Sequence, residues 1–491
     1  MLRLPPYFAQ SYLSAQTEDQ TMDHMHVIAK DRSGRMGALA GLSLAILLSS
    51  LGTSIANVAL PTLGHVFSAS FQQVQWVVLA YLLASTVLIA GIGRLGDLFG
   101  RRLLLLGGLA LFSVASLLAA AAPSLAVLIV ARAFQGAGAA AMMALAMAFV
   151  SETVPQERIG SVMGLFGTTS AVGTALGPSL GGLLIATFGW PSIFLVAVPF
   201  GILAFALVWR FVPAGRVAKG AGRFDLVGAA LLAAALGAYA LAMTVGAGGI
   251  DAWNTGLLAA AAVAAALFVI RQRRAAFPLI RPAAFRRPGF AASLVASMQV
   301  ATVIMVTLVV GPFYLSRTLG LGPAHVGFVL ATGPVVSVLT GVVAGRMADR
   351  FGAVRMTLAG LAAMAAGAGA LPVLAGLFGL AGYIAAIVVL TPGYQLFQAA
   401  NNAAVMSGVP EGERGVTSAL LNLSRNLGLI TGASLMGAIF TLAVGTKDVA
   451  NAGGAAVATG LHVTFGVAAA LLLAALALMA FRFASNRSGT A

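Results

Sequence analysis

Cysteine is absent from this sequence, and charged residues are rare. None of the 491 residues is cysteine and only 8% are charged, whereas 60% are hydrophobic. Without cysteine, the chain has no disulfide bond, thiolate metal site or thiol nucleophile. Because a soluble globular domain carries about 25% charged residues, this composition excludes a soluble globular protein.

Long apolar runs fill most of the chain. A membrane-spanning helix needs about 20 apolar residues, and runs of this length are separated here by polar or Gly/Pro turns. We therefore expect an all-α polytopic membrane protein with fourteen transmembrane helices, at residues 36–60, 74–96, 103–122, 124–149, 160–187, 192–210, 226–246, 254–271, 289–315, 325–346, 355–376, 378–408, 415–444 and 459–482.

Basic residues outnumber acidic ones, with 28 Lys and Arg against 13 Asp and Glu. Of the 28, 24 fall in the tails or in loops that follow even-numbered spans, and only Arg317 and Lys447 fall in loops on the other side. Basic residues are retained on the cytoplasmic side during insertion. This distribution predicts an inner-membrane protein with both termini cytoplasmic, and it explains the net charge of +15 without nucleic-acid binding.

The two halves of the chain carry the same pattern. The phrase G-R-x-x-D-x-F-G runs from Gly93 to Gly100 after span two and recurs from Gly345 to Gly352 after span ten. Spans 1–6 and 9–14 are therefore predicted to be two parallel copies of a six-helix unit. The predicted organisation is a cytoplasmic disordered tail at 1–35, an N-terminal six-helix bundle at 36–212, a linker with two extra transmembrane helices at 213–288, a C-terminal six-helix bundle at 289–482 and a cytoplasmic tail at 483–491.

Three motifs carry more specific information. They are G-x-L-x-D-x-x-G-R-R from Gly93 to Arg102, R-x-x-Q-G-x-G from Arg132 to Gly138, and G-x-x-x-G-P-x-x-G-G from Gly173 to Gly182. With these motifs, residues 36–482 resemble the major facilitator superfamily, and within it the fourteen-spanner drug:proton antiporters of EmrB/QacA type. The resemblance implies a major facilitator fold and export of small amphipathic compounds by alternating access, coupled to proton antiport.

The first motif and its second copy are implied by this resemblance to form a cytoplasmic latch that holds the outward-open state. Its glycines permit a tight turn, and Asp97 can face a helix N-terminus, whose dipole favours a carboxylate. The alternative is a plain basic loop kept in the cytoplasm by its arginines. The predicted latch residues are Gly93, Asp97, Gly100, Arg101, Arg102, Asp349 and Arg350.

Arg132 and Gln135 share one face of span four. An arginine inside a span is costly and usually faces a cavity, and the resemblance implies a role in proton coupling or substrate contact. The alternative is that Arg132, roughly 12 Å from the start of the span, extends its charged end to the outer interface.

Span five carries glycines four residues apart, together with a Gly-Pro pair. Small residues at this spacing let helix backbones approach closely, and proline permits a kink. Such spacing also occurs in membrane helices that only pack, but with Gly-Pro it resembles the antiporter signature of exporters. The predicted motif residues are Gly173, Gly177, Pro178, Gly181 and Gly182.

Polar side chains within other spans are candidates for a substrate cavity. The alternative is that their amides bond neighbouring helices. Arg132 and Arg425 are the only formal charges expected away from span ends, so neutral or weakly acidic amphiphiles are the expected substrates. Besides Arg132 and Gln135, the predicted coupling and cavity residues are Asn57, Gln395, Gln398, Asn402, Asn422, Arg425 and Asn426.

Gly52 stands where the family usually has an acidic residue in span one. None of the 13 acidic residues is expected at mid-membrane. Because arginine keeps its proton in proteins, a carboxylate relay must use Glu152 or Asp97 near the inner face, or the substrate itself must carry the proton. The proton gradient is thus implied by the resemblance alone.

Signals for other chemistry are missing. The sequence has no G-x-x-x-x-G-K-[ST] loop, its five histidines are scattered, and no acid pair or Ser-His-Asp set appears. We expect a transporter rather than an enzyme, with no metal or cofactor. Export of one specific metabolite and, in a different class, a polytopic enzyme or sensor stay open. The expected partners are a small-molecule substrate and the lipid bilayer; a periplasmic adaptor stays open, and we expect a monomer.

Overall fold

The computed structural model describes residues 34–153, 159–213, 225–244, 252–275, 278–279, 289–406, 409, 414–446 and 448–488. Within these residues every regular element is a helix. The predicted tail at 1–35 lies outside the described residues except for its last two, which begin the first helix at residue 34. The predicted tail at 483–491 is helical as far as Ser488, because the last helix continues beyond its apolar stretch.

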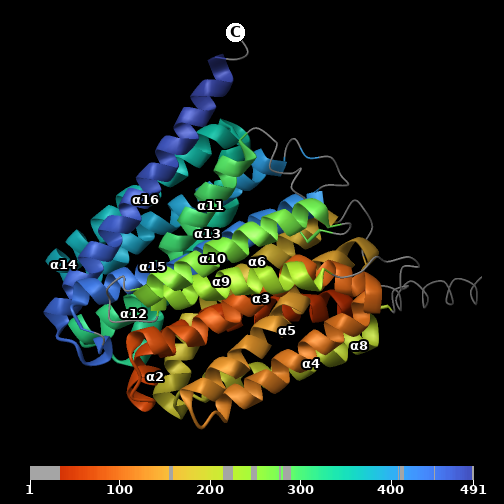
Figure 1. Ribbon diagram of the computed structural model, residues 1–491, viewed down its shortest axis with the longest axis horizontal. Coiled ribbons are helices and arrows are strands. Elements are labelled where there is room, and N and C mark those ends of the chain that lie inside the picture. Colours follow the sequence, from red (N-terminus) through yellow and green to blue (C-terminus); the bar gives the residue numbers. More distant parts are fainter. Residues whose placement is uncertain are drawn as a thin grey trace, which may run out of the picture.

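The N-terminal group of helices begins with a first helix at residues 34–54. This N-terminal group, coloured red to yellow, forms one side of the molecule in Figure 1. Its further elements are η1 (Asn57–Ala59), α2 (Leu60–Val66), α3 (Phe71–Phe99), α4 (Arg101–Ala120), α5 (Leu125–Thr153), α6 (Ile159–Phe188), α7 (Ser192–Leu195) and α8 (Ala197–Phe211).

The C-terminal group forms the other side of the molecule, coloured green to blue in Figure 1. Its elements are α11 (Phe290–Val309), α12 (Gly311–Phe313), η4 (Tyr314–Thr318), α13 (Pro323–Phe351), α14 (Ala353–Met406), α15 (Arg414–Val444), η6 (Val449–Asn451) and α16 (Gly454–Ser488).

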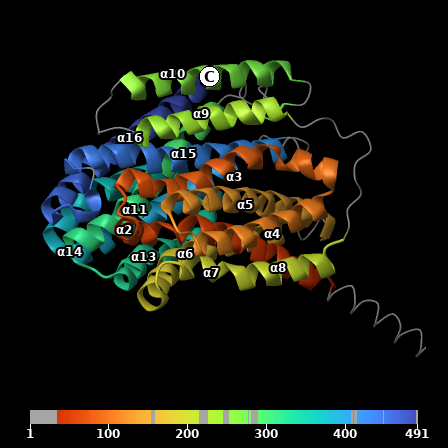
Figure 2. The same ribbon diagram turned by 60° about the horizontal axis from the view of Figure 1, so that its bottom comes forward.

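Two further helices, α9 (Leu226–Thr244) and α10 (Ala252–Arg274), lie between the groups in sequence. Figure 2 shows α10 outermost, with α9 between it and the helices α3 and α15. The Trp76 indole N–H on α3 donates to the Thr244 hydroxyl at 3.0 Å, and α9 also packs against α15. Helix α9 therefore contacts one helix of each group.

Asp225 joins α9 to α10 at one end of this pair. Its carboxylate accepts hydrogen bonds from the Gly228 backbone N–H, from Arg271 Nε and from Gln272 Nε2, each at 3.0 Å. Burial of Asp225 raises its pKa, but these hydrogen bonds and the Arg271 charge outweigh that effect, so the pKa lies below its ordinary value.

Twelve helices of the described part are long and apolar enough to cross a membrane. Helix α14 counts once among them, although its 54 residues would extend about 81 Å at 1.5 Å per residue, far beyond the ~30 Å of a bilayer core. Its backbone leaves helical geometry at Gly379 (φ 57°, ψ −128°). In α6, a shorter apolar stretch runs from Val172 to Phe188.

Large apolar side chains face outward along these helices. Phe188 is 77% exposed, Leu377 71% and Leu339 70%. In water such a surface would aggregate, whereas hydrocarbon solvates it. The chain is a multi-pass membrane protein.

Candidate functional site

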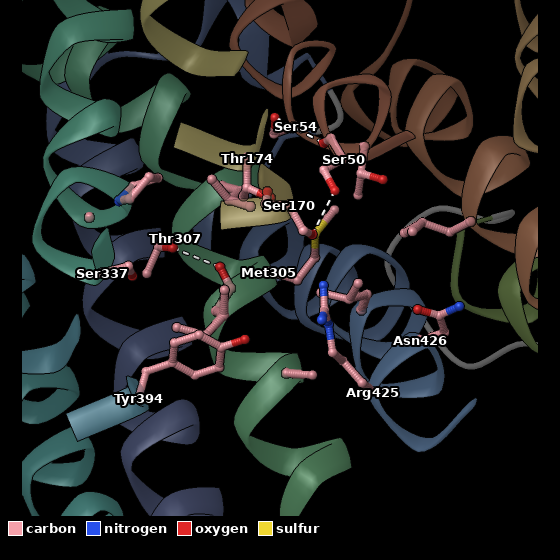
Figure 3. Close-up of a pocket in the computed structure, with 18 of the residues that line it drawn as sticks. Ser50, Ser54, Ser170, Thr174, Met305, Thr307, Ser337, Tyr394, Arg425 and Asn426 are labelled. Carbon is pink, nitrogen blue, oxygen red and sulfur yellow. Dashed lines mark hydrogen bonds between the residues drawn. The ribbon is translucent and has the colours of Figure 1, made fainter. Parts of the chain in front are cut away.

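A cavity of about 310 Å³ lies between the two groups of helices. The first helix, α3, α5 and α6 form its N-terminal wall, and α11, α13, α14 and α15 form its C-terminal wall. The lining residues sit near the middle of most of these helices, for example Ala139 and Met143 in α5. Figure 3 shows side chains from both walls pointing into the same space.

The N-terminal wall presents hydroxyl groups that are bonded within the wall. The hydroxyls of Ser50 and Ser170 lie 2.7 Å apart, the Tyr81 hydroxyl donates to the Ser49 carbonyl at 2.7 Å, and Thr53 donates to the same carbonyl at 3.1 Å. Because these hydroxyls already donate hydrogen bonds within the wall, they are not available as donors to a ligand. The polar lining residues of this wall are Ser49, Ser50, Thr53, Ser54, Tyr81, Ser85, Ser170 and Thr174.

The C-terminal wall carries more kinds of polar side chain, and fewer of them are hydrogen-bonded. Gln395, Gln398 and Asn426 make no hydrogen bond within the described part of the chain, and the buried Tyr383 hydroxyl has no partner there. Because polar groups left unpaired in an apolar setting are costly, these groups need water or a ligand. The polar lining residues of this wall are Thr307, Ser337, Tyr383, Thr391, Tyr394, Gln395, Gln398, Arg425 and Asn426.

Arg425 is the one charged side chain among the described lining residues. It is half-buried on α15. Figure 3 shows its guanidinium pointing toward Met305 on α11. In the described structure it has no ion pair or hydrogen-bond partner. This guanidinium is therefore open to a ligand in the cavity.

Arg132 lies behind the N-terminal wall and not in the cavity. It is fully buried on α5, where Nε donates to the Val77 carbonyl at 2.8 Å and Nη2 to the Gly52 carbonyl at 3.0 Å. Nη1 donates to Gln135 Oε1 at 2.5 Å, and the guanidinium lies 4.3 Å from the centre of the Tyr81 ring. The structure thus supports neither of the positions considered for Arg132, a cavity wall or the outer interface, because carbonyls of two other helices bind it.

Gln135 extends the same network. Its amide donates to the Ser116 hydroxyl at 2.7 Å on α4. Neither Arg132 nor Gln135 lines the cavity. Their contacts connect the first helix, α3, α4 and α5, which is the interhelical role that amides and arginines play when they are buried in a bundle.

The remaining predicted cavity residues separate into two sets. Asn57 is buried in η1 and donates to the carbonyls of Thr53 and Ser54, while Asn402 is exposed on α14 and Asn422 is half-buried on α15. None of these three lines the cavity. The predicted residues that the structure does bring together there are Gln395, Gln398, Arg425 and Asn426.

The sequence reasoning missed the aromatic lining residues. Tyr394 precedes Gln395 and lies one helical turn from Gln398, so the helix face that carries the amide could have identified it. Tyr81 and Tyr383 gave no such signal, because a tyrosine in an apolar helix is more often packed in the core. Among the described residues, no group of three or more His, Cys, Asp or Glu side chains could bind a metal ion.

The glycine stripe of α6 packs against the first helix. A Cβ on Gly173 would lie 2.6 Å from the Leu47 carbonyl, and one on Gly177 would overlap the Ser54 side chain. In α15, Gly428 and Gly432 make the same kind of contact with Met298 and Thr302 of α11. Both groups therefore use one packing arrangement, in which glycines bring two helix backbones together beside the cavity.

At the end of the molecule that holds the loops at 67–70 and 319–322, here called the distal end, the two groups touch. A Cβ on Gly182 of α6 would lie 2.9 Å from the Gly327 Cα of α13. The Phe71 ring of α3 meets Phe313 and Phe440 with centroids 4.8 and 5.4 Å away. These contacts separate the cavity from the distal end.

The two copies of the loop motif form similar turns. Gly100, between α3 and α4, has φ 89° and ψ 123°, and Gly352, between α13 and α14, has φ 87° and ψ 139°. These positive φ values strain any residue other than glycine. The chain therefore turns from α3 into α4 in much the same way as it turns from α13 into α14.

The side chains of the predicted latch are only partly described. Gly93 and Asp97 belong to α3, but the side chain of Asp97 lies outside the described part of the structure. Arg101 is half-buried, and Arg102 donates to the Trp209 carbonyl and lies over the Trp209 ring. Asp349 and Arg350 are exposed. Arg102 thus holds α4 against α8.

The family of this chain follows from its sequence. The sequence model of the Major Facilitator Superfamily matches residues 42–433. The chain belongs to the Major Facilitator Superfamily. The family's members and the relatives named below are transporters, and transporters of this family bind their substrates between their two halves near the middle of the membrane.

Several characterised proteins are similar over most of their length. The multidrug efflux pump LfrA of Mycolicibacterium smegmatis is 32% identical over 410 residues, covering 82% of this chain and 80% of the pump. The riboflavin transporter RibZ of Clostridioides difficile is 29% identical over 401 residues, covering 81% and 87%. A solved bacterial homologue of the human lysosomal transporter Spinster, inward-facing and unoccupied, has a TM-score of 0.65 at 16% identity and covers 91% and 97%.

Proposed function

We propose that this protein exports small amphipathic compounds by alternating access. The observation that carries the proposal is the cavity between the two groups, lined by apolar and polar side chains from both and separated from the distal end by contacts between them. Rocking of one half against the other around such a site would expose it to each side of the membrane in turn. The cavity's mixed lining suits amphipathic compounds.

Relatives support drug efflux. Besides LfrA, the multidrug resistance protein Stp and the drug efflux pump JefA of Mycobacterium tuberculosis are 32% identical, each covering at least 81% of this chain. The riboflavin transporter RibZ favours a second candidate, export of one specific metabolite. We take multidrug efflux as the leading proposal because the hydroxyls of the N-terminal wall are bonded within that wall, which leaves few groups there to recognise one particular compound.

We also propose fourteen transmembrane helices of EmrB/QacA type. Two observations support this number over twelve. Helix α14 divides at Gly379 into two stretches, each long enough to span a bilayer, and α6 continues across the same layer as its neighbours from Ile159 to Phe188. On this topology the protein lies in the inner membrane with both termini cytoplasmic, and the distal end is periplasmic.

Proton antiport is part of the proposal and rests on the family resemblance. No carboxylate or histidine occurs among the described lining residues, so a relay would run through Glu152 or Asp97, or the substrate would carry the proton itself. We further propose that the paired loop motifs act as a latch, that the protein works as a monomer without catalytic activity, and that a periplasmic adaptor could join it.

Transport into inverted membrane vesicles tests the function. Vesicles containing the full chain should accumulate several fluorescent amphiphiles when a pH gradient is imposed, and a protonophore should abolish the accumulation. Vesicles with the Arg210→Gln variant, which changes an exposed arginine at the end of α8, should accumulate as much dye as the wild type at equal protein content. Accumulation that equals that of vesicles lacking the protein, for every compound tested, would contradict export.

A further inference from the structure

The charge on the cavity wall has one sign. Arg425 is the single charged residue among the described lining residues, and no Asp or Glu accompanies it. It lies five residues into the apolar stretch Leu420–Val444, roughly 8 Å along the helix axis. A guanidinium at this depth is costly without a counter-ion or hydrogen-bond acceptors.

The second intramembrane arginine shows how the same cost is met when no ligand is involved. The Arg132 guanidinium is bonded to two backbone carbonyls, to Gln135 and to the face of Tyr81. Arg425 has no equivalent contacts in the described part of the chain. The two arginines therefore differ in function as well as place: one fixes helices, and the other has its donors directed into an open cavity.

Neutral donors line the same wall of the cavity as Arg425. Tyr394, Gln395 and Asn426 line the same wall and make no hydrogen bond in the described structure. The Tyr383 hydroxyl, fully buried and without a partner, is a further group on this wall. A carboxylate needs up to four donors, and this wall can offer a fork of guanidinium N–H groups together with amide and hydroxyl hydrogens.

We propose that the cavity selects amphiphiles that carry one anionic group, a carboxylate or sulfonate, which pairs with Arg425 while the apolar body rests on residues such as Met143 and Leu308. This inference rests on the proposed function, since it names the substrate class of the same cavity. Lipophilic cations are disfavoured, because they would be desolvated next to an arginine with no carboxylate to compensate.

Three probes with one ring system separate charge from shape. They are a diethylaminocoumarin carboxylic acid, its neutral ethylamide and its cationic trimethylammonioethyl amide. Their binding to the purified full chain in nanodiscs is followed by fluorescence anisotropy. We expect the carboxylate to bind at least about tenfold more tightly than the cation, as one charge-assisted hydrogen bond allows.

Variants then assign this preference to Arg425. Arg425→Gln should weaken carboxylate binding about 10- to 100-fold and change binding of the neutral amide less than about twofold. Arg425→Lys should restore part of the loss, because it keeps the charge but not the fork. Arg210→Gln, which removes an exposed arginine at the end of α8, should leave all three affinities unchanged.

The outcomes distinguish this proposal from the proposed function. Equal affinities of the three probes for the wild-type protein, no binding of any probe, or an equal loss of all three in Arg425→Gln would overturn the anionic substrate class. Export of cationic dyes in the vesicle assay would support the export function and contradict the anionic substrate class. Selective binding of the carboxylate probe without transport in vesicles would support the anionic ligand class and contradict the export function.

Discussion

The N-terminal and C-terminal walls of the cavity contain polar residues in similar positions but use them differently. In the N-terminal wall, hydroxyls such as Ser50 and Ser170 bond one another or their own helices, and the arginine lies behind the wall. In the C-terminal wall, amides, tyrosines and Arg425 face the cavity without partners in the described structure. The comparison shows that the polar groups of one half are bonded within their wall, whereas those of the other half are available to a ligand.

The difference does not come from the helix packing, which is alike in both groups. Glycines of α6 contact the first helix as glycines of α15 contact α11, and the turns at Gly100 and Gly352 have nearly the same backbone angles. Two similar frameworks therefore carry different side chains on their inner faces. Substitutions that affect the framework should change stability, and substitutions on the C-terminal wall should change affinity.

The largest expected effect is on the framework of the N-terminal group. Arg132→Gln would leave the carbonyls of Gly52 and Val77 unpaired and remove the contact with Tyr81. We expect a loss of about 3 kcal/mol or more, seen as a large fall in the melting temperature of the purified protein. Arg425→Gln is the matched control and should melt within a few degrees of wild type. Similar melting of both variants would erase the distinction between the two arginines.

The next effect concerns the glycine stripe. Gly177→Val would overlap Ser54 on the first helix, and overpacking of this kind costs about 1–3 kcal/mol. Gly182→Val instead presses against Gly327 of the other group, so it should separate the groups at the distal end with less loss of stability. Thermal melting measures the first effect. His65 of α2 and Arg317 of η4 contact each other between the two groups. Cross-linking of cysteines introduced at these two positions measures the second effect, since no native cysteine competes. A wild-type melting temperature for Gly177→Val would show that the glycines of α6 do not pack closely against the first helix.

A smaller effect is expected from a single hydroxyl on the C-terminal wall. Tyr394→Phe removes one donor that is free for a ligand, and a neutral hydrogen bond contributes about 0.5–1.5 kcal/mol. Carboxylate probe binding should weaken about 3- to 10-fold while the melting temperature stays the same. A change in stability with unaltered affinity would show that this hydroxyl packs rather than binds.

The smallest effect is expected from the corresponding change on the N-terminal wall. Ser170→Ala removes the partner of the Ser50 hydroxyl, which can turn to another acceptor on its own helix. Affinity for the same probe should change less than about twofold, a difference of less than 0.5 kcal/mol. A loss of affinity as large as that of Tyr394→Phe would mean that both walls bind the ligand.

Sequence patterns predicted the framework well. The helices fall close to the expected ranges, because apolar length and turn residues are local features. Gly173 and Gly177 were predicted to support a close helix contact, and the structure shows that contact with the first helix. The kink at Gly379 agrees with the predicted boundary between the apolar stretches at 355–376 and 378–408.

The cavity was predicted less well, because its composition depends on distant partners. Nothing near Arg132 in sequence indicates that carbonyls 80 and 55 residues away bind its guanidinium. Asn402 and Gln398 are four residues apart on α14, yet Asn402 is exposed and Gln398 lines the cavity. A period of 3.6 residues defines a helix face only approximately, and the neighbouring helices decide which part of that face is open.

The most direct measurement is the binding selectivity of the Arg425→Glu variant. If the C-terminal wall sets the charge of the ligand, replacing its one positive charge by a negative charge should invert the preference between the carboxylate and the trimethylammonium coumarins. We predict that the ratio of their dissociation constants crosses one and changes at least about 100-fold in total, with the neutral amide affected little. An unchanged ratio in a folded Arg425→Glu protein would contradict the account, because the ligand's charge would then be read elsewhere.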